Sequence, residues 1–123
     1  MINEKLLSKV LWTNPNPKVA FPAQSIVLND KIENYRYYEI IYIAYANDNS
    51  AWFSIDTFLS TGKFAGRRTR LPYLDYMIRN RTVTNMSENS MTFGNGGSYA
   101  TYASDTLSVN NLICVPYQVI GYK

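Results

Sequence analysis

Alternating apolar and polar residues run along most of this chain and are broken by turn-forming residues about every ten positions. The densest apolar segment, residues 35–46, consists largely of tyrosine and isoleucine. These side chains lose rotamer freedom in a helix, so the segment is predicted to be a central β-strand. One face would carry Tyr37, Glu39, Ile41, Ile43 and Tyr45, and the other Tyr38, Ile40, Tyr42, Ala44 and Ala46. Both faces are mainly apolar, which predicts cover on both sides, within a sandwich or against another subunit.

The same pattern predicts further strands before and after the central one. Residues 6–13 fit either a short helix or a strand, and the prolines in residues 13–17 predict a rigid extended turn. Residues 21–28 indicate a strand that Pro22 confines to a sheet edge or to a strand start. After the polar turn at residues 47–50, residues 52–59 are expected to pair back onto the central strand as a hairpin. Shorter strands are predicted at residues 79–84, 90–93 and 99–103.

The end of the chain and two glycine-bearing segments complete this prediction. Residues 112–123 form a long predicted strand that must bulge or lie at an edge at Pro116, because proline cannot donate to the sheet. Residues 60–70 are basic and contain glycine, which indicates a loop, and residues 94–98 permit positive φ, which predicts a tight turn or a flexible tip. Without a convincing helix, the expected fold is all-β: an antiparallel β-sandwich or jelly roll formed by residues 1–123 as a single domain, with residues 1–10 as an N-terminal extension.

Composition favours a protein that binds. The chain has 123 residues, enough for one core, and its 11 tyrosines and 2 tryptophans favour strands, protein interfaces and sugar-binding surfaces. The net charge of +3 is unevenly spread, because residues 63–81 contain six basic side chains and a single acid, Asp75. The basic residues are Lys63, Arg67, Arg68, Arg70, Arg79 and Arg81. Either they form an anion-binding patch, or they are solvated and pair with acids such as Asp48, Asp56 or Glu88.

Several classes of chemistry are missing from the sequence. The chain has no histidine and one cysteine, Cys114, so histidine-dependent nucleophiles, histidine metal ligands, thiolate zinc sites and an intrachain disulfide are all excluded. No cofactor or metal is expected. The first residues contain no apolar stretch of the length that a secretory signal needs, and no segment approaches a membrane span. The protein is therefore expected to be made in a cytoplasm without a signal peptide and not to insert into a membrane.

A glycosidase would survive these exclusions, because it needs only two nearby carboxylates. The candidates are Asp48, Asp56, Asp75, Glu88 and Asp105, none of which lies in a recognisable motif. No catalytic residue is assigned, and the protein is expected not to be an enzyme. The candidate ligand-binding residues are instead basic and aromatic side chains expected on loops or short strands: Arg67, Arg68, Arg70, Tyr73, Tyr76, Tyr99 and Tyr102. No element for nucleic-acid recognition accompanies the arginines, so nucleic acid is not an expected partner.

The two ends of the chain resemble a known family. Leu11-Trp-Thr-Asn-Pro-Asn-Pro17 with Phe21-Pro-Ala-Gln24, and a close built from Met91-Thr-Phe-Gly94 and residues 110–123, are similar to the C-terminal β-rich domain of tail and tail-fibre proteins from bacteriophages and prophages of Gram-positive bacteria. The similarity spans nearly the whole chain, and its motifs specify strands and turns. The chain departs from the pattern at its front, because Met1 leaves no room for a stalk before Trp12.

The resemblance implies a virion domain, often trimeric, that displays loops towards the host envelope. Its expected partners are a host cell-wall polysaccharide or teichoic acid, other phage tail proteins and further copies of the chain in a trimer. The expected function is therefore receptor binding by a tail component. One alternative is a structural tail subunit with only protein contacts, and a more distant one is a wall-glycan hydrolase that uses paired carboxylates.

Overall fold

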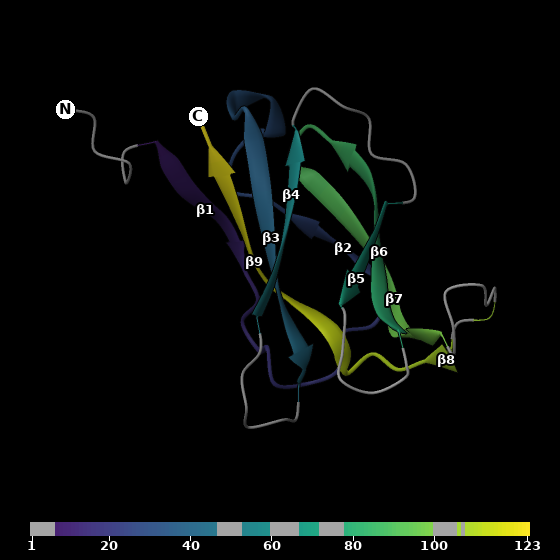
Figure 1. Ribbon diagram of the computed structural model, residues 1–123. Helices are drawn as coiled ribbons and strands as arrows, with labels where there is room; N and C mark the ends of the chain where they lie inside the picture. Colours follow the sequence, from purple (N-terminus) through teal and green to yellow (C-terminus); the bar gives the residue numbers. More distant parts are fainter. Residues whose placement is uncertain (1–6, 47–52, 60–66, 72–77, 100–105, 107) are drawn as a thin grey trace.

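The strands of this protein form two antiparallel sheets that pack face to face (Figure 1). The computed structural model describes residues 7–46, 53–59, 67–71, 78–99, 106 and 108–123. The strands are β1 (Ser8–Thr13), β2 (Gln24–Val27), β3 (Tyr37–Tyr45), β4 (Phe53–Leu59), β5 (Arg67–Leu71), β6 (Ile78–Ser87), β7 (Ser90–Tyr99), β8 (Ser108–Val109) and β9 (Ile113–Tyr122). A 3₁₀ turn, η2 (Ile32–Asn34), precedes β3. The all-β sandwich prediction is confirmed.

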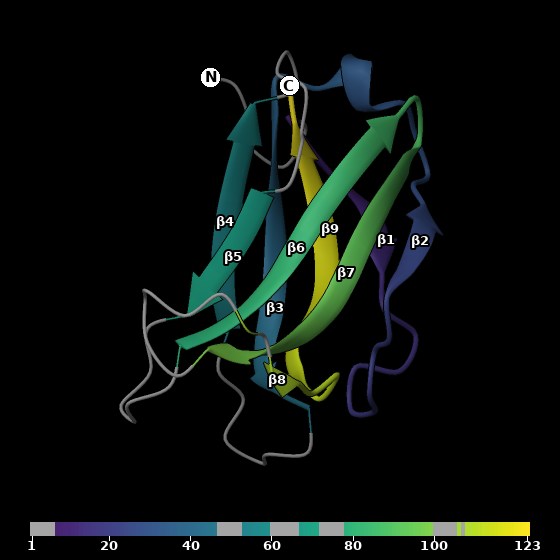
Figure 2. The same ribbon diagram turned by 90° about the vertical axis from the view of Figure 1, so that its right-hand side faces the viewer.

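The two sheets of the sandwich have corresponding strand orders. The four-stranded sheet has the order β1-β9-β3-β4, and the five-stranded sheet has the order β2-β7-β6-β5 with β8 paired to β7. Strands β1 and β2 therefore form the edges on one side, and β4 and β5 the edges on the other (Figure 2). Within the described residues, no helix has the length and apolarity needed to cross a membrane.

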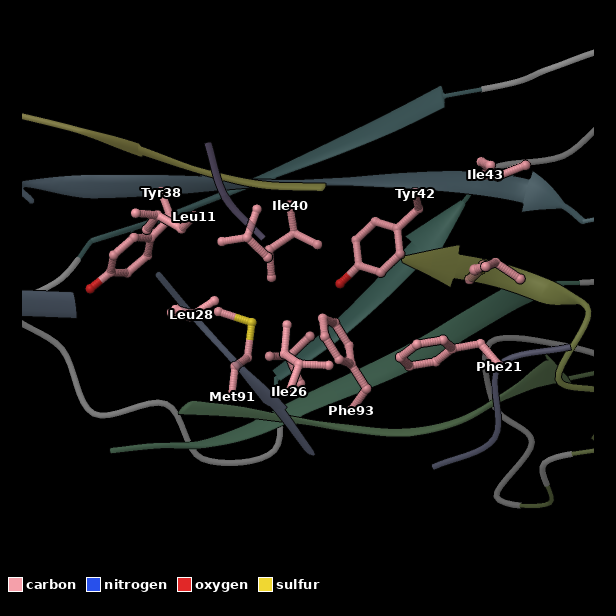
Figure 3. Close-up of a cluster of buried hydrophobic side chains, with 14 of the residues drawn as sticks. Leu11, Phe21, Ile26, Leu28, Tyr38, Ile40, Tyr42, Ile43, Met91 and Phe93 are labelled. Atoms are coloured by element: carbon pink, nitrogen blue, oxygen red, sulfur yellow. The ribbon is translucent and has the colours of Figure 1, made fainter. Parts of the chain in front are cut away.

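The central strand of the sequence prediction is confirmed as β3, which lies between β4 and β9. The predicted hairpin is also confirmed, since β3 and β4 pair from Tyr37 opposite Leu59 to Ile43 opposite Phe53. The side chains of Tyr38, Ile40 and Tyr42 are fully buried and point towards the other sheet (Figure 3). The opposite face of β3 begins with Tyr37, Glu39 and Ile41, which are only half-buried.

The core joins both sheets around these side chains. From the five-stranded sheet it receives Ile26, Met91 and Phe93, and from the connections it receives Phe21 and Leu28 (Figure 3). Tyr42 meets Phe93 edge to face, with their ring centroids 6.4 Å apart, a favoured geometry for aromatic pairs. The inner faces of the two sheets therefore share one continuous apolar core.

The last strand bulges as predicted at Pro116. The register between β3 and β9 pairs Ile41 with Gln118 and Tyr42 with Pro116, so Tyr117 is the extra residue. A bulge leaves one residue outside the regular pairing, which accommodates a residue that cannot donate a hydrogen bond.

The segment at residues 6–13, for which the sequence left helix and strand open, contains a strand, because β1 pairs with β9 from Ser8 to Thr13. Residues 8–10 therefore belong to the sheet. The strand expected at residues 21–28 begins only at Gln24, after Pro22, and lies at an edge.

Two predictions about glycine-bearing segments are wrong. Residues 94–98 lie inside β7, and the final residues of the expected 60–70 loop belong to β5. Two glycines of β7 are needed because their surroundings leave no room for a side chain. A Cβ on Gly94 would collide with Thr82 Oγ1, and a Cβ on Gly96 would collide with Ile113 O. A strand glycine can mark close approach of other atoms as well as a turn. The predicted turn at 47–50 and most of the predicted strand at 99–103 lie outside the described residues.

Tyr35 makes the fold sensitive to alkaline pH. Its side chain is buried, and its hydroxyl donates a 2.8 Å hydrogen bond to Asp30 Oδ2. Burial, and then this hydrogen bond, raise the pKa of Tyr35 to about 12. The folded state therefore keeps a proton that the unfolded chain releases near the usual tyrosine pKa of 10.0. The stabilising contribution is complete below pH 10 and is lost as pH rises towards 12.

We expect this loss to disappear in a Tyr35→Phe variant. Urea unfolding at steps between about pH 9 and about pH 12 gives the free energy of unfolding of both proteins. The excess stability of the natural protein over Tyr35→Phe is expected to shrink with rising pH. A difference that stays constant over this range would contradict the assignment.

Candidate functional site

A groove opens where the two edge strands β1 and β2 meet. It has a volume of about 410 Å³, within the range typical of small-molecule sites. Much of its wall comes from the connection between β1 and β2. The lining residues are Trp12, Asn14, Pro15, Asn16, Val19, Ala20, Phe21, Gln24, Ser25 and Ile26.

A bulge in β1 places Trp12 in this groove. The register with β9 pairs Val10 with Ile120 but Trp12 with Val119, so Leu11 is the extra residue. Regular alternation would send only one of two successive side chains inward. Because of the bulge, Leu11 is fully buried and Trp12 packs against the core as well, while remaining partly exposed.

Two phenylalanines hold the indole of Trp12. Its ring centroid lies 6.0 Å from that of Phe21, edge to face, and 6.3 Å from that of Phe93. Phe21 and Phe93 also meet edge to face at 5.8 Å. The two edge-to-face pairs, Trp12 with Phe21 and Phe21 with Phe93, stabilise the cluster beyond the area that the rings bury. The indole is therefore a preorganised apolar surface.

Asn14 anchors the connection that walls the groove. Its amide Nδ2 donates to Pro116 O at 2.8 Å, and its backbone N–H donates to Tyr117 O at 2.7 Å. Its Oδ1 accepts the backbone N–H of Asn16 at 2.9 Å, which forms a local Asx turn. Asn14 is buried and fully engaged, so it has a structural role. Asn16 is exposed, and its side chain makes no hydrogen bond to the described part of the chain.

The polar side of the groove comes from β2. Gln24 is exposed and uses Nε2 to donate to Pro22 O at 3.1 Å, so its Oε1 faces solvent without a bond to the described residues. The Ser25 hydroxyl shares a 2.7 Å hydrogen bond with Thr92. The segment before β2 is fixed by Asn95, whose Oδ1 accepts the Ala23 N–H at 3.1 Å. The groove thus combines one aromatic surface with neutral hydrogen-bonding groups.

Arg81 lies behind the groove and holds Phe21 in place. The side chain is fully buried on β6, and its guanidinium carbon lies 5.4 Å from the centre of the Phe21 ring. It donates five hydrogen bonds of 2.7 to 3.4 Å, all to backbone carbonyls. The acceptors are Phe21, Gly94, Asn111, Ile113 and Cys114. Burial lowers the pKa of Arg81 to about 10, so the group is still a cation at pH 7.

This burial corrects the expectation that Arg81 is part of a basic surface. Among the described residues, the hydrogen-bond acceptors of its guanidinium are all carbonyl oxygens. One of the residues whose carbonyl accepts from Arg81, Cys114, has a φ of 51°. This is a left-handed conformation that is unusual for a residue with a side chain. Arg81 therefore ties β9 and the segment before β2 to β6, and it is unavailable to an anionic ligand.

The binding residues predicted from sequence lie elsewhere or outside the described residues. Strand β5 carries Arg67, Arg68 and Arg70, whose backbone positions pair with Val83, Thr82 and Asn80. Successive strand positions alternate between faces, so positions 68 and 70 share a face that position 67 does not. Strand β5 is the edge opposite the β1–β2 edge, so the arginines and the groove are separate. Tyr99 is the last residue of β7, and Tyr73, Tyr76 and Tyr102 lie outside the described residues.

Sequence reasoning missed Trp12, Asn16 and Gln24 as a site. Trp12 and the asparagines that follow it gave a partial signal, because an aromatic beside amide side chains suits sugar binding. The meeting of β1 with β2 across the sandwich could not be deduced from that signal. The groove can hold a ligand by stacking and neutral hydrogen bonds, and it carries no ionisable lining side chain. The chain matches no protein-family model, no curated protein and no solved structure, so this geometry carries the functional argument.

Proposed function

We propose that this protein is a recognition domain that binds a host cell-surface glycan as a component of a bacteriophage or prophage tail. It works by contact alone and breaks no bond. The observation that carries the proposal is the groove at the β1–β2 edge, in which a fixed indole lies beside exposed amide groups. Indole rings stack on the apolar faces of sugars, and amides exchange hydrogen bonds with hydroxyls.

The tail context rests on the resemblance of the two chain ends. These ends contact one another, because β1 pairs with β9 and Asn14 bonds to Pro116 and Tyr117. The opening segment of the resemblance also supplies much of the groove wall. A tail protein of this kind would be made in the host cytoplasm, would act in the virion and would contact other tail proteins. The groove supports the receptor-binding proposal, because a purely structural subunit would have no need of it.

Pull-down with purified Gram-positive cell walls tests this function. The natural protein is expected to sediment with walls of its host, and Trp12→Ala is expected to lose at least about tenfold in affinity, because the stacking surface of the groove is removed. Gln24→Ala changes an exposed side chain of the groove, so the loss of affinity expected from it cannot be attributed to unfolding. Gln118→Ala changes an amide on the outer face of the four-stranded sheet, so it is the matched control and is expected to bind normally. Undiminished binding by Trp12→Ala and Gln24→Ala would reject the groove as the site.

A homotrimer is part of the same proposal. The outer face of the four-stranded sheet carries Ile41 and Ile120, both half-buried, and Val10, which is 42% exposed. Such a face would gain stability if another copy covered it. Light scattering after size exclusion is expected to give three times the 14.1 kDa chain mass. A mass of one chain at micromolar concentration would reject the trimer and leave the groove proposal untouched.

A further inference from the structure

We infer that the groove selects an uncharged sugar unit and rejects anionic wall polymers such as teichoic acid. This inference rests on the proposed function and makes it narrower. It departs from the expectation, drawn from net charge, that the basic residues 63–81 would recognise an anionic polymer. Within that range, Arg67, Arg68 and Arg70 lie on β5, at the edge opposite the groove, so the groove and these arginines make separate and opposite predictions.

The charge of the groove argues for a neutral ligand. None of its ten lining residues is ionisable. The buried cation Arg81 has its guanidinium behind the Phe21 ring, where it donates its hydrogen bonds to carbonyls. A phosphate or carboxylate that entered the groove would lose water without gaining a charged partner, which costs more than burying a paired group. Lys18 belongs to the same connection, but it is exposed and does not line the groove.

The hydrogen-bonding groups suit sugar hydroxyls or an acetamido group. Asn16 offers both a donor and an acceptor, and Gln24 offers Oε1 as an acceptor because its Nε2 is engaged by Pro22. Both side chains are exposed at the groove, and neither carries a charge. Val19 and Ala20 add small apolar contacts on the same wall. A volume of about 410 Å³ has room for roughly one or two sugar rings, and not for a long segment of polymer.

Calorimetric titration with two panels of ligands tests this inference. The neutral panel consists of glucose and N-acetylglucosamine oligomers together with neutral wall polysaccharide fragments. The anionic panel consists of poly(glycerol phosphate) and oligogalacturonate. We expect binding only from the neutral panel, with affinity unchanged between about 50 and about 300 mM NaCl, since no ion pair is formed. Asn16→Ala is expected to weaken binding about tenfold. Lys18→Ala and the triple variant Arg67→Ala, Arg68→Ala, Arg70→Ala are expected to bind like the natural protein.

The outcomes separate this inference from the function on which it rests. Trp12-dependent binding of the anionic panel, weakened by salt or by Lys18→Ala, would overturn the neutral selectivity and leave the groove as a glycan site. Anionic binding that the triple arginine variant abolishes would place recognition at β5, and would overturn the neutral selectivity and the groove as the site while leaving wall-polymer recognition as the function. Failure of both panels to bind would overturn both the neutral selectivity and the proposed function, because the neutral panel includes wall polysaccharide fragments.

Discussion

Replacing Arg81 with methionine is expected to lower the free energy of unfolding by more than about 4 kcal/mol. Two effects oppose one another. Removing a buried cation relieves its desolvation cost, and apolar substitutes for buried ion pairs can even stabilise a protein. Arg81, however, satisfies five backbone carbonyls at once, and methionine would leave them without its donors. Each buried acceptor that is left unsatisfied costs about 1–3 kcal/mol, so the loss of hydrogen bonds outweighs the relief.

Urea unfolding monitored by circular dichroism measures this effect. Arg81→Lys keeps the charge but cannot reproduce the guanidinium geometry, so it is expected to destabilise nearly as much. Lys18→Met changes an exposed basic residue and is expected to stay within about 0.5 kcal/mol of the natural protein. A loss below about 1 kcal/mol for Arg81→Met would show that the carbonyls find other partners.

The second large effect is expected from Gly96→Ala, at about 3 kcal/mol or more. The new Cβ would collide with the carbonyl oxygen of Ile113 and with the guanidinium of Arg81. The first obstacle is the backbone of β9, which can move only if the pairing of that strand shifts. The second is held by hydrogen bonds that the collision would break. Overpacking at this position therefore strains both sheets.

A comparison with Gly94 identifies the cause of that strain. A Cβ on Gly94 would meet Thr82 mainly through its side-chain Oγ1. The instability of Gly94→Ala should therefore be largely restored by a second change, Thr82→Ala, which removes the obstructing atom. No single side-chain truncation should restore Gly96→Ala. If Gly96→Ala were as stable as the natural protein by thermal unfolding, the proposed contact between β7 and β9 would be wrong.

Local alternation was enough to predict the central strand and its hairpin. Residues 35–46 and 52–59 carry side chains that fit a pleated sheet, and β3 and β4 pair in the expected way. The bulge at Pro116 was also predictable, because the missing N–H of proline is a local property. The fold class followed from such segments and from the spacing of turns.

Long-range contacts decided what the sequence concealed. Arg81 has the same side chain as the arginines around it, and only the arrangement of carbonyls from three other segments buries it. The glycines of β7 resembled a turn because their crowding depends on β6 and β9. The groove needs a bulge at Leu11 and the meeting of β1 with β2 across the sandwich. None of these contacts is encoded in a single stretch of sequence.

The most direct test of glycan recognition in the groove is a titration of the isotope-labelled protein with host wall oligosaccharide, followed by two-dimensional NMR. The chain has two tryptophans, so the indole N–H of Trp52 serves as an internal control for that of Trp12. The account predicts that saturable shifts are concentrated on the Trp12 indole and on the side-chain amides of Asn16 and Gln24. Shifts that leave these three groups unmoved while the arginine N–H signals of β5 respond would contradict it.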